Sequence, residues 1–212
     1  MDDIFSNLLF IGSGILVTLK LLGGGILVGI SLGGALSILR YSGICKPLIN
    51  GLVSVIRGTP LILQVSLIYF SMPCVIGIKL DIISAGIIAF GLNSSAYVSE
   101  ILRAGIESLP RGQFEAAKTL AIPNYFMWKD IILPQVIRNV FPAMVNEIVS
   151  LLKETAIIST IGGLDIMRAS QMVAAQQYEY FMPLCIAGGY YYSLVLFIEY
   201  IGRKIEKLKI YA

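Results

Sequence analysis

The sequence predicts an all-α integral membrane protein with about five transmembrane helices, and three observations lead to that prediction. The chain has 212 residues, of which 57% are hydrophobic and only 14% are charged, whereas soluble domains carry about 25% charged residues. Its mean hydropathy is +0.83, and a single core of this size cannot bury so much apolar surface. The apolar residues also gather in uncharged runs close to the roughly 20 residues that cross a bilayer.

The first span is predicted over residues 8–39. Two uncharged runs, Ile4–Leu19 and Leu21–Leu39, are separated only by Lys20, so the part before Lys20 is either an interfacial helix or an extension of the span. Small residues at every fourth position let helix backbones approach closely in lipid, and this span has Gly25, Gly29 and Gly33. We interpret these glycines as a packing surface rather than a hinge.

Four further spans are predicted over residues 58–78, 82–103, 134–161 and 181–201, and a sixth is left open. The fourth of these five spans is apolar but carries charges, namely Arg138, Glu147, Lys153 and Glu154. Its Pro134 suits the first turn of a helix, and Pro142 predicts a kink. Residues 1–212 are therefore expected to form one membrane domain with a cytoplasmic loop over 104–133.

Positive residues indicate the topology, because Lys and Arg gather in cytoplasmic loops. With the loop 104–133 inside, only Lys79 and Arg168 face outward, and twelve basic residues lie on the inner side: Arg40, Lys46, Arg57, Arg103, Arg111, Lys118, Lys129, Arg138, Arg203, Lys204, Lys207 and Lys209. This bias predicts an outer N-terminus and an inner C-terminus. The start Met1-Asp2-Asp3 lacks the basic leader of a cleaved signal peptide, so the chain is interpreted as uncleaved.

The composition excludes several classes of protein. There is no histidine, so His-ligated metals, His general bases and nucleophile–His pairs are excluded. Three cysteines, an odd number spread along the chain, are typical of apolar filler rather than of disulfides or a metal site. The net charge of +3 is too small for a nucleic-acid surface. An intramembrane hydrolase is disfavoured because no Asp lies within a span, and we predict no catalytic residue and no metal site.

The cytoplasmic loop contains a predicted short amphipathic helix, Arg111–Leu120. Phe114, Ala117 and either Leu120 or Ala121 recur at helical spacing among polar residues, which is typical of an amphipathic helix. Ile122-Pro123 predicts its end. Because this helix lies outside the bilayer, its apolar side needs a cover, either the protein's own cytoplasmic ends and the lipid surface or a docking partner.

The same loop carries residues that resemble the EAA signature of the membrane subunits of ABC importers. Glu115-Ala116-Ala117 is followed after three residues by Ala121, and after nine more by Ile131-Ile132-Leu133-Pro134. The family has Gly where Ala121 stands, and Ala would be strained if the turn there required a positive φ. Further segments resemble the polar amino-acid subfamily, over roughly residues 12 to 205: Arg57-Gly58-Thr59-Pro60-Leu61, Asn93 to Arg103, Leu109 to Gln113 and Ser150 to Thr155.

This resemblance implies a type I ABC importer permease fold and a permease subunit for a polar amino acid, glutamine or a basic amino acid. Another small solute, or an ATP-independent carrier or channel, is the alternative. The implied partners are an ABC ATPase subunit dimer, a second permease subunit (a copy or a paralogue) and an extracytoplasmic solute-binding protein, at the cytoplasmic (inner) membrane of a prokaryote. The chain has no Gly-x-x-x-x-Gly-Lys-Ser/Thr phosphate loop, so it is expected to bind no cofactor itself, with ATP and Mg on the ATPase.

The resemblance also implies which residues contact the ATPase, namely Arg111, Gly112, Glu115, Ala116, Ala117 and Ala121. Polar groups inside spans are costly, about 2.5–3.5 kcal/mol for a charge at mid-helix. The polar residues within the predicted spans are therefore candidates for lining the substrate path. Asn93, Tyr97 and Glu100 share one helix face, and the adjacent Lys153 and Glu154 point to different sides. The alternative roles are a Glu100–Arg103 ion pair and interhelical pairing of Lys153 and Glu154.

Overall fold

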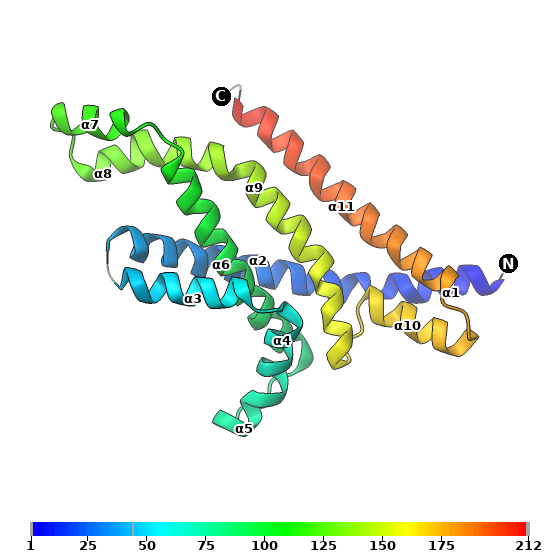
Figure 1. Cartoon of the computed structure of the whole chain (residues 1–212). Coiled ribbons are helices and arrows are strands. Elements are labelled where there is room, and N and C mark those ends of the chain that lie inside the picture. The colour runs from blue at the N-terminus through cyan, green and yellow to red at the C-terminus, as the bar shows by residue number, and fades with distance from the viewer. Residues whose placement is uncertain (1, 44, 211–212) are drawn as a thin grey trace.

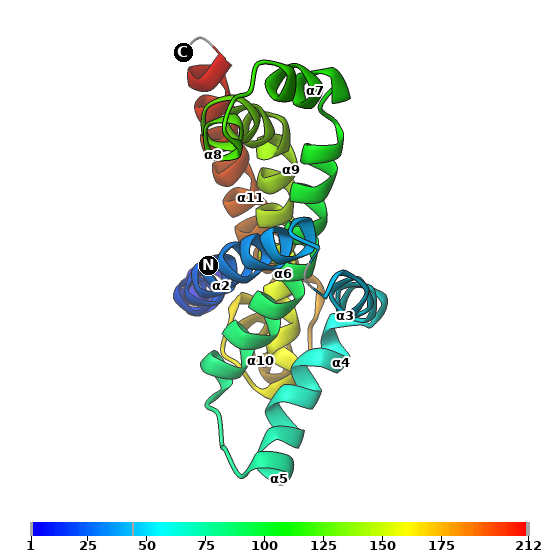
Figure 2. The ribbon, with the colours of Figure 1, turned by 90° about the vertical axis from the view of Figure 1, so that its left-hand side faces the viewer.

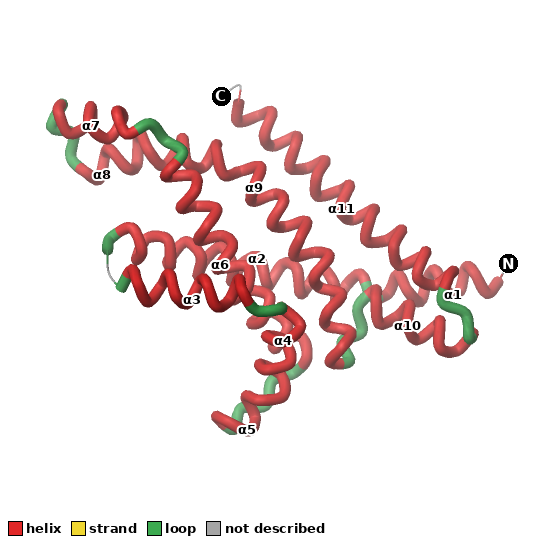
Figure 3. Tube along the Cα trace, viewed as in Figure 1, coloured by secondary structure: helices red, strands yellow, loops and turns green. Residues whose placement is uncertain are grey.

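The computed structural model describes residues 2–43 and 45–210, so the expected domain limits at 1 and 212 lie outside the described residues. Within them every element is a helix and there is no strand, as the tube in Figure 3 shows. The predicted all-α fold is therefore confirmed. The short helices α7 and α8 lie at one end of the molecule and α5 lies at the opposite end (Figure 2).

Three described stretches are long and apolar enough to cross a membrane, Ile4–Tyr41, Ile82–Glu107 and Phe181–Lys207. The first joins α1 (Asp2–Ser13) to α2 (Ile15–Tyr41), so the residues before Lys20 extend the first span (Figure 1). The second is α6 (Ile82–Glu107) and the third lies in α11 (Phe181–Ile210).

A bent pair of helices counts as a fourth span when its two parts are taken together. It comprises α3 (Lys46–Gly58) and the segment Leu61–Val75, which meet at 101°. That segment runs through α4 (Leu61–Ser66), η1 (Leu67–Ser71) and α5 (Met72–Ile76). The chain bends at Thr59, which is extended with φ −110° and ψ 142°, because the residue before a proline is excluded from the helical region.

Helix α3 was not predicted, because the uncharged run between Lys46 and Arg57 is far shorter than a membrane span. It buries only Ile49 and Val53, which pack with Ala96 of α6. Helix α10 (Ile166–Gln177) was also not predicted. It is too short for a span, and it lies beside α1 and the start of α11 (Figure 1).

The fourth predicted span corresponds to α9 (Leu133–Glu154) followed by the 3-10 segment η3 (Thr155–Ile161). Pro134 lies in the first turn of α9 and Pro142 lies inside it. Helix α9 is not among the described stretches that are apolar enough to cross a membrane, and it carries both charged and polar residues. It nevertheless packs against both α6 and α11.

The glycines of α2 allow this helix to pack directly on α6. A Cβ on Gly29 would lie 2.8 Å from the Cβ of Ser94, and one on Gly33 would lie 2.7 Å from the carbonyl oxygen of Ser95. Contacts between heavy atoms of that length are repulsive, so only glycine permits this approach. The predicted packing role of the glycines is confirmed.

Outside the spans, α6 begins at a cap. The carboxylate of Asp81 accepts a hydrogen bond from the backbone N–H of Ser84 at 3.1 Å, which satisfies a free donor of the first turn. Hydrogen bonds from the side chain and the backbone of Ser84 hold the pKa of Asp81 below its usual value.

Candidate functional site

The predicted amphipathic helix is α7 (Arg111–Thr119). Its Ala117 is only 3% exposed and packs in a cluster with Met127 and Ile132, which belong to η2 (Met127–Ile132). The apolar side of α7 is thus covered by the chain's own η2 and the start of α9. The other predicted ATPase-contact residues are exposed on the surface of α7 and its end: Arg111, Gly112, Glu115, Ala116 and Ala121.

Helix α7 ends on Ala121 in the left-handed conformation, with φ +52°. The N–H of Ala121 donates to the carbonyl of Lys118 at 3.0 Å, and the N–H of Ile122 donates to the carbonyl of Ala117 at 3.0 Å. These two bonds form the Schellman motif, in which glycine is preferred because it has no Cβ penalty. The turn does adopt a positive φ here, which is the condition under which alanine is strained.

A reciprocal amide pair joins α7 to α9. Gln113 Nε2 donates to Gln135 Oε1 at 3.0 Å, and Gln135 Nε2 donates to Gln113 Oε1 at 2.8 Å. Gln135 Nε2 also donates to the carbonyl of Ile131 at 2.7 Å. Helix α7 is therefore connected to the first turn of α9 through polar contacts as well as through packing.

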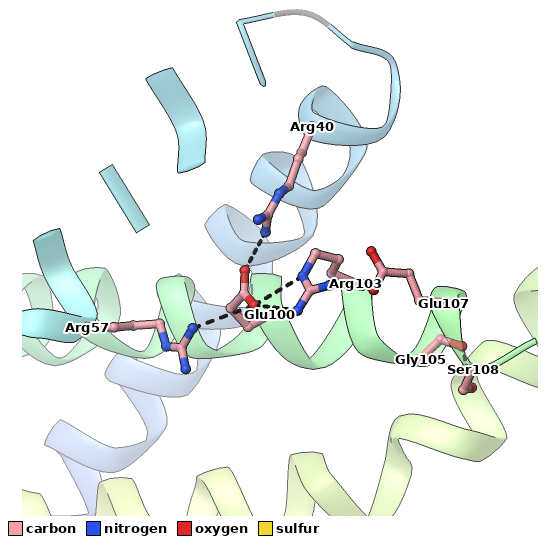
Figure 4. Close-up of polar contacts among 7 residues, drawn as sticks. All are labelled: Arg40, Arg57, Glu100, Arg103, Gly105, Glu107 and Ser108. Atoms are coloured by element: carbon pink, nitrogen blue, oxygen red, sulfur yellow. Dashed lines mark hydrogen bonds and ion pairs between the residues drawn. The ribbon is translucent and has the colours of Figure 1, made fainter. Parts of the chain in front are cut away.

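Glu100 lies at the centre of an ion-pair cluster (Figure 4). It pairs with Arg40 of α2, with Arg103 one turn further along α6 at 2.9 Å, and with Arg57 of α3 at 3.5 Å. Its side chain is only 17% exposed, and the Arg57 guanidinium lies 5.3 Å from the centre of the Tyr97 ring. The Glu100–Arg103 pair expected as the alternative role is present, and the cluster ties together α2, α3 and α6.

Asn93 is buried and contacts a residue that the sequence prediction did not include in the site. Its Nδ2 donates to Gln64 Oε1 at 3.3 Å. Gln64 Nε2 in turn donates to the carbonyl of Ile56 and to the hydroxyl of Thr59, both at 2.8 Å. Gln64 thus clamps the bend between α3 and α4 and connects it to α6. A polar amide within an otherwise apolar span was the signal that could have identified it.

Glu147 is a second residue that the predicted site omitted. Its carboxylate accepts a hydrogen bond from the Ser94 hydroxyl at 2.7 Å. Glu154 lies seven residues further along α9, so the two carboxylates share one helix face, and both are half-buried while Lys153 is exposed. The interhelical ion pair expected as the alternative for Lys153 and Glu154 does not form within the described residues, where the ion pairs involve none of these three side chains.

This arrangement places two carboxylates in a largely apolar bundle, and neither forms an ion pair among the described residues. Removing a carboxylate from water is costly unless a positive charge or hydrogen bonds compensate it. A cation that entered the bundle would supply this compensation. Carboxylates of this kind can pair with an ammonium or a guanidinium group.

Comparisons with known proteins agree with this structure. Residues 25–207 match the family described as binding-protein-dependent transport system inner membrane component. The chain is 48% identical over 205 residues to the putative glutamine transport system permease protein GlnP of Rickettsia typhi, covering 96% of this chain and 94% of the relative. It is 44% identical over 201 residues to the arginine transport system permease protein ArtQ of Bacillus subtilis, covering 93% and 91%.

Two solved structures share the fold. A crystal structure of an amino acid ABC transporter with histidines superimposes with a TM-score of 0.86 at 35% identity, over 93% of each chain. The MetNI methionine ABC transporter in an inward-facing conformation gives a TM-score of 0.73 at 15% identity, over 94% of each chain. At that identity the MetNI match supports the fold alone.

Proposed function

The chain belongs to the family of binding-protein-dependent transport system inner membrane components, and from that premise we propose that it carries a basic amino acid across the membrane. It is an integral membrane protein and the permease of an amino-acid ABC importer, not an enzyme. The observation that carries the proposal is the pair of carboxylates on one face of α9, Glu147 and Glu154, which form no ion pair within the described chain.

The charge count distinguishes a basic from a neutral amino acid. The α-ammonium group, common to every amino acid, compensates one carboxylate. A side-chain guanidinium or ammonium group compensates a second, whereas glutamine would leave one carboxylate uncompensated inside the bundle. Lys153 is the candidate partner for the substrate carboxylate, and Asn93 and Tyr97 extend the polar surface along α6. Glu100 is assigned instead to the arginine cluster that holds three helices together.

Glutamine is the second candidate, because the relative from Rickettsia typhi is named a putative glutamine permease. The relative from Bacillus subtilis is named an arginine permease at similar identity. Related proteins with different named substrates do not distinguish the two candidates, and the carboxylate pair is the observation that supports a basic amino acid.

As an ABC transporter permease, the chain works with ATPase subunits. We propose that a pair of ATPase chains binds ATP and Mg and docks on α7, where Glu115 and Ala116 are exposed and a carboxylate can pair with a basic residue of the partner. A second permease subunit and a solute-binding protein complete the proposed complex, in the inner membrane of a prokaryote.

In the proposed mechanism, nucleotide binds more tightly to one of two conformations of the complex and so shifts the population toward it. The ATPase pair closes and carries α7 with it. The Gln113–Gln135 amide pair passes that displacement to α9, which bears Glu147 and Glu154. The residues that hold the substrate thus move with the helix that contacts the ATPase.

The test is equilibrium binding of labelled arginine to the purified complex without its solute-binding protein, so that the permease alone sets the selectivity. Citrulline is the matched competitor, because it has the shape of arginine without the charge. We expect arginine and lysine to compete strongly and citrulline and glutamine weakly, and Glu154→Gln to reduce this preference at least about tenfold. Equal competition by glutamine would assign the neutral substrate.

A further inference from the structure

Two adjoining clefts lie at the end of the molecule where basic residues gather. One has a volume of about 450 Å³ and lies between α2, α6, η2 and the first turns of α9. Apolar side chains form most of its wall: Ile38, Leu102, Ile106, Trp128, Leu133 and Val136. Ile38 is 70% exposed and Leu133 is 46% exposed, so within the described chain this groove opens outward along the apolar surface of the spans.

The second cleft, of about 220 Å³, is lined by the basic residues Arg40, Lys46 and Arg103, together with Glu107. It shares Ser37, Tyr41 and Ile106 with the apolar groove, so the two form one continuous surface. Two of these basic residues, Arg40 and Arg103, pair with Glu100 in the cluster of Figure 4, which also includes Arg57, and Arg103 pairs with Glu107 as well. Lys46 is exposed and takes part in none of the ion pairs of the described chain.

Two aromatic rings stand at the junction. Tyr41 packs edge-on against Trp128, with ring centres 4.6 Å apart. Tyr and Trp are enriched at the depth of lipid headgroups, where the apolar ring and the polar tip meet different surroundings. The two rings at the junction are typical of the level at which the hydrocarbon region gives way to the polar boundary.

We propose that these clefts bind an anionic phospholipid of the inner leaflet, with its phosphate beside Lys46 and Arg40 and an acyl chain in the groove between α2 and α9. A free phosphate would use only the basic cleft, and a neutral lipid would gain nothing from it. The excess of two positive charges at the polar end of an apolar groove matches a negatively charged amphiphile. This inference goes beyond the transport function and does not rest on it.

The chain contains one tryptophan, and because that residue is Trp128 its fluorescence reports directly on the groove. The full-length chain is reconstituted in phosphatidylcholine vesicles that contain increasing fractions of phosphatidylglycerol brominated on its acyl chains. Brominated phosphatidylcholine serves as the neutral comparison. We expect phosphatidylglycerol to quench Trp128 at a lower mole fraction than phosphatidylcholine does.

Two pairs of variants separate the headgroup from the acyl chain. Lys46→Gln is expected to reduce the preference for phosphatidylglycerol about five-fold, the contribution of one basic side chain near a membrane surface, whereas Lys204→Gln on α11 leaves the preference intact. Gly34 lines the groove and nothing lies within 4 Å of a Cβ there, so Gly34→Leu is expected to occupy the groove and to reduce quenching by both lipids. Gly23→Leu is its control, since its Cβ is equally free and lies outside the groove.

Equal quenching by the two lipids in the unmodified chain would overturn the proposal, because it would mean ordinary lipid contact. A preference that persists in Lys46→Gln would also overturn the assigned headgroup position. Absence of quenching by either lipid would show that the groove is closed to the bilayer and is a protein interface.

Discussion

The Ser94 hydroxyl on α6 donates a hydrogen bond of 2.7 Å to the Glu147 carboxylate on α9. The contact joins residues separated by 53 positions, and on α6 Ser94 directly follows Asn93. It therefore connects the two helices that contribute the proposed substrate-binding groups.

Substitutions of these two residues are expected to have different effects. Ser94→Ala removes the donor and should lower the free energy of unfolding by about 1.5–3 kcal/mol, the contribution of a hydrogen bond to a charged group. Glu147→Gln keeps an acceptor at the same place, so it should preserve most of the stability and lose selectivity for arginine over citrulline. Thermal unfolding of the purified complex and equilibrium binding measure the two effects, and a large loss of stability in Glu147→Gln would contradict the separation.

The close packing of α2 on α6 predicts a position-specific effect of a single methyl group. Gly29→Ala places a Cβ 2.8 Å from Ser94 Cβ and should destabilise the protein by about 1–3 kcal/mol through overpacking. Gly23→Ala is the control on the same helix, because nothing lies within 4 Å of its Cβ. It should be neutral or stabilising, since alanine favours helix more than glycine does. Equal melting temperatures for the two variants would contradict the packing argument.

These glycines also show how far the sequence determines the fold. Spacing along one helix predicted the packing surface of α2 and the amphipathic α7, because both patterns are local. The partners were not predictable in the same way, since Ser94–Glu147 and Arg40–Glu100 join residues 53 and 60 positions apart. Helices α3 and α10 were not predicted because both are shorter than a membrane span and both contain polar residues.

The left-handed residue at the end of α7 predicts a stabilising substitution. Ala121 has a φ of +52°, which costs an L-residue with a Cβ about 1–2 kcal/mol. Ala121→Gly should therefore raise the stability by about 1 kcal/mol, part of the gain being offset by the entropy of the unfolded chain. Ala121→Val should lower it, because a branched Cβ fits the left-handed region poorly. Thermal unfolding of both variants checks the sign, and a loss of stability in Ala121→Gly would show that the conformation is not strained.

Docking of the ATPase on α7 predicts that a charge reversal on its surface disrupts the complex without unfolding the chain. Glu115 is exposed, so Glu115→Lys removes no buried contact and should leave the melting temperature of the isolated chain unchanged. Loss of a charge pair at an interface typically weakens association, so less ATPase should co-purify from the membrane in mild detergent. Glu179→Lys is the matched control, since Glu179 is also exposed and lies between α10 and α11, far along the chain from α7. If both variants retain the ATPase equally, then α7 does not form the interface through Glu115, and the exposed side of this helix needs another explanation.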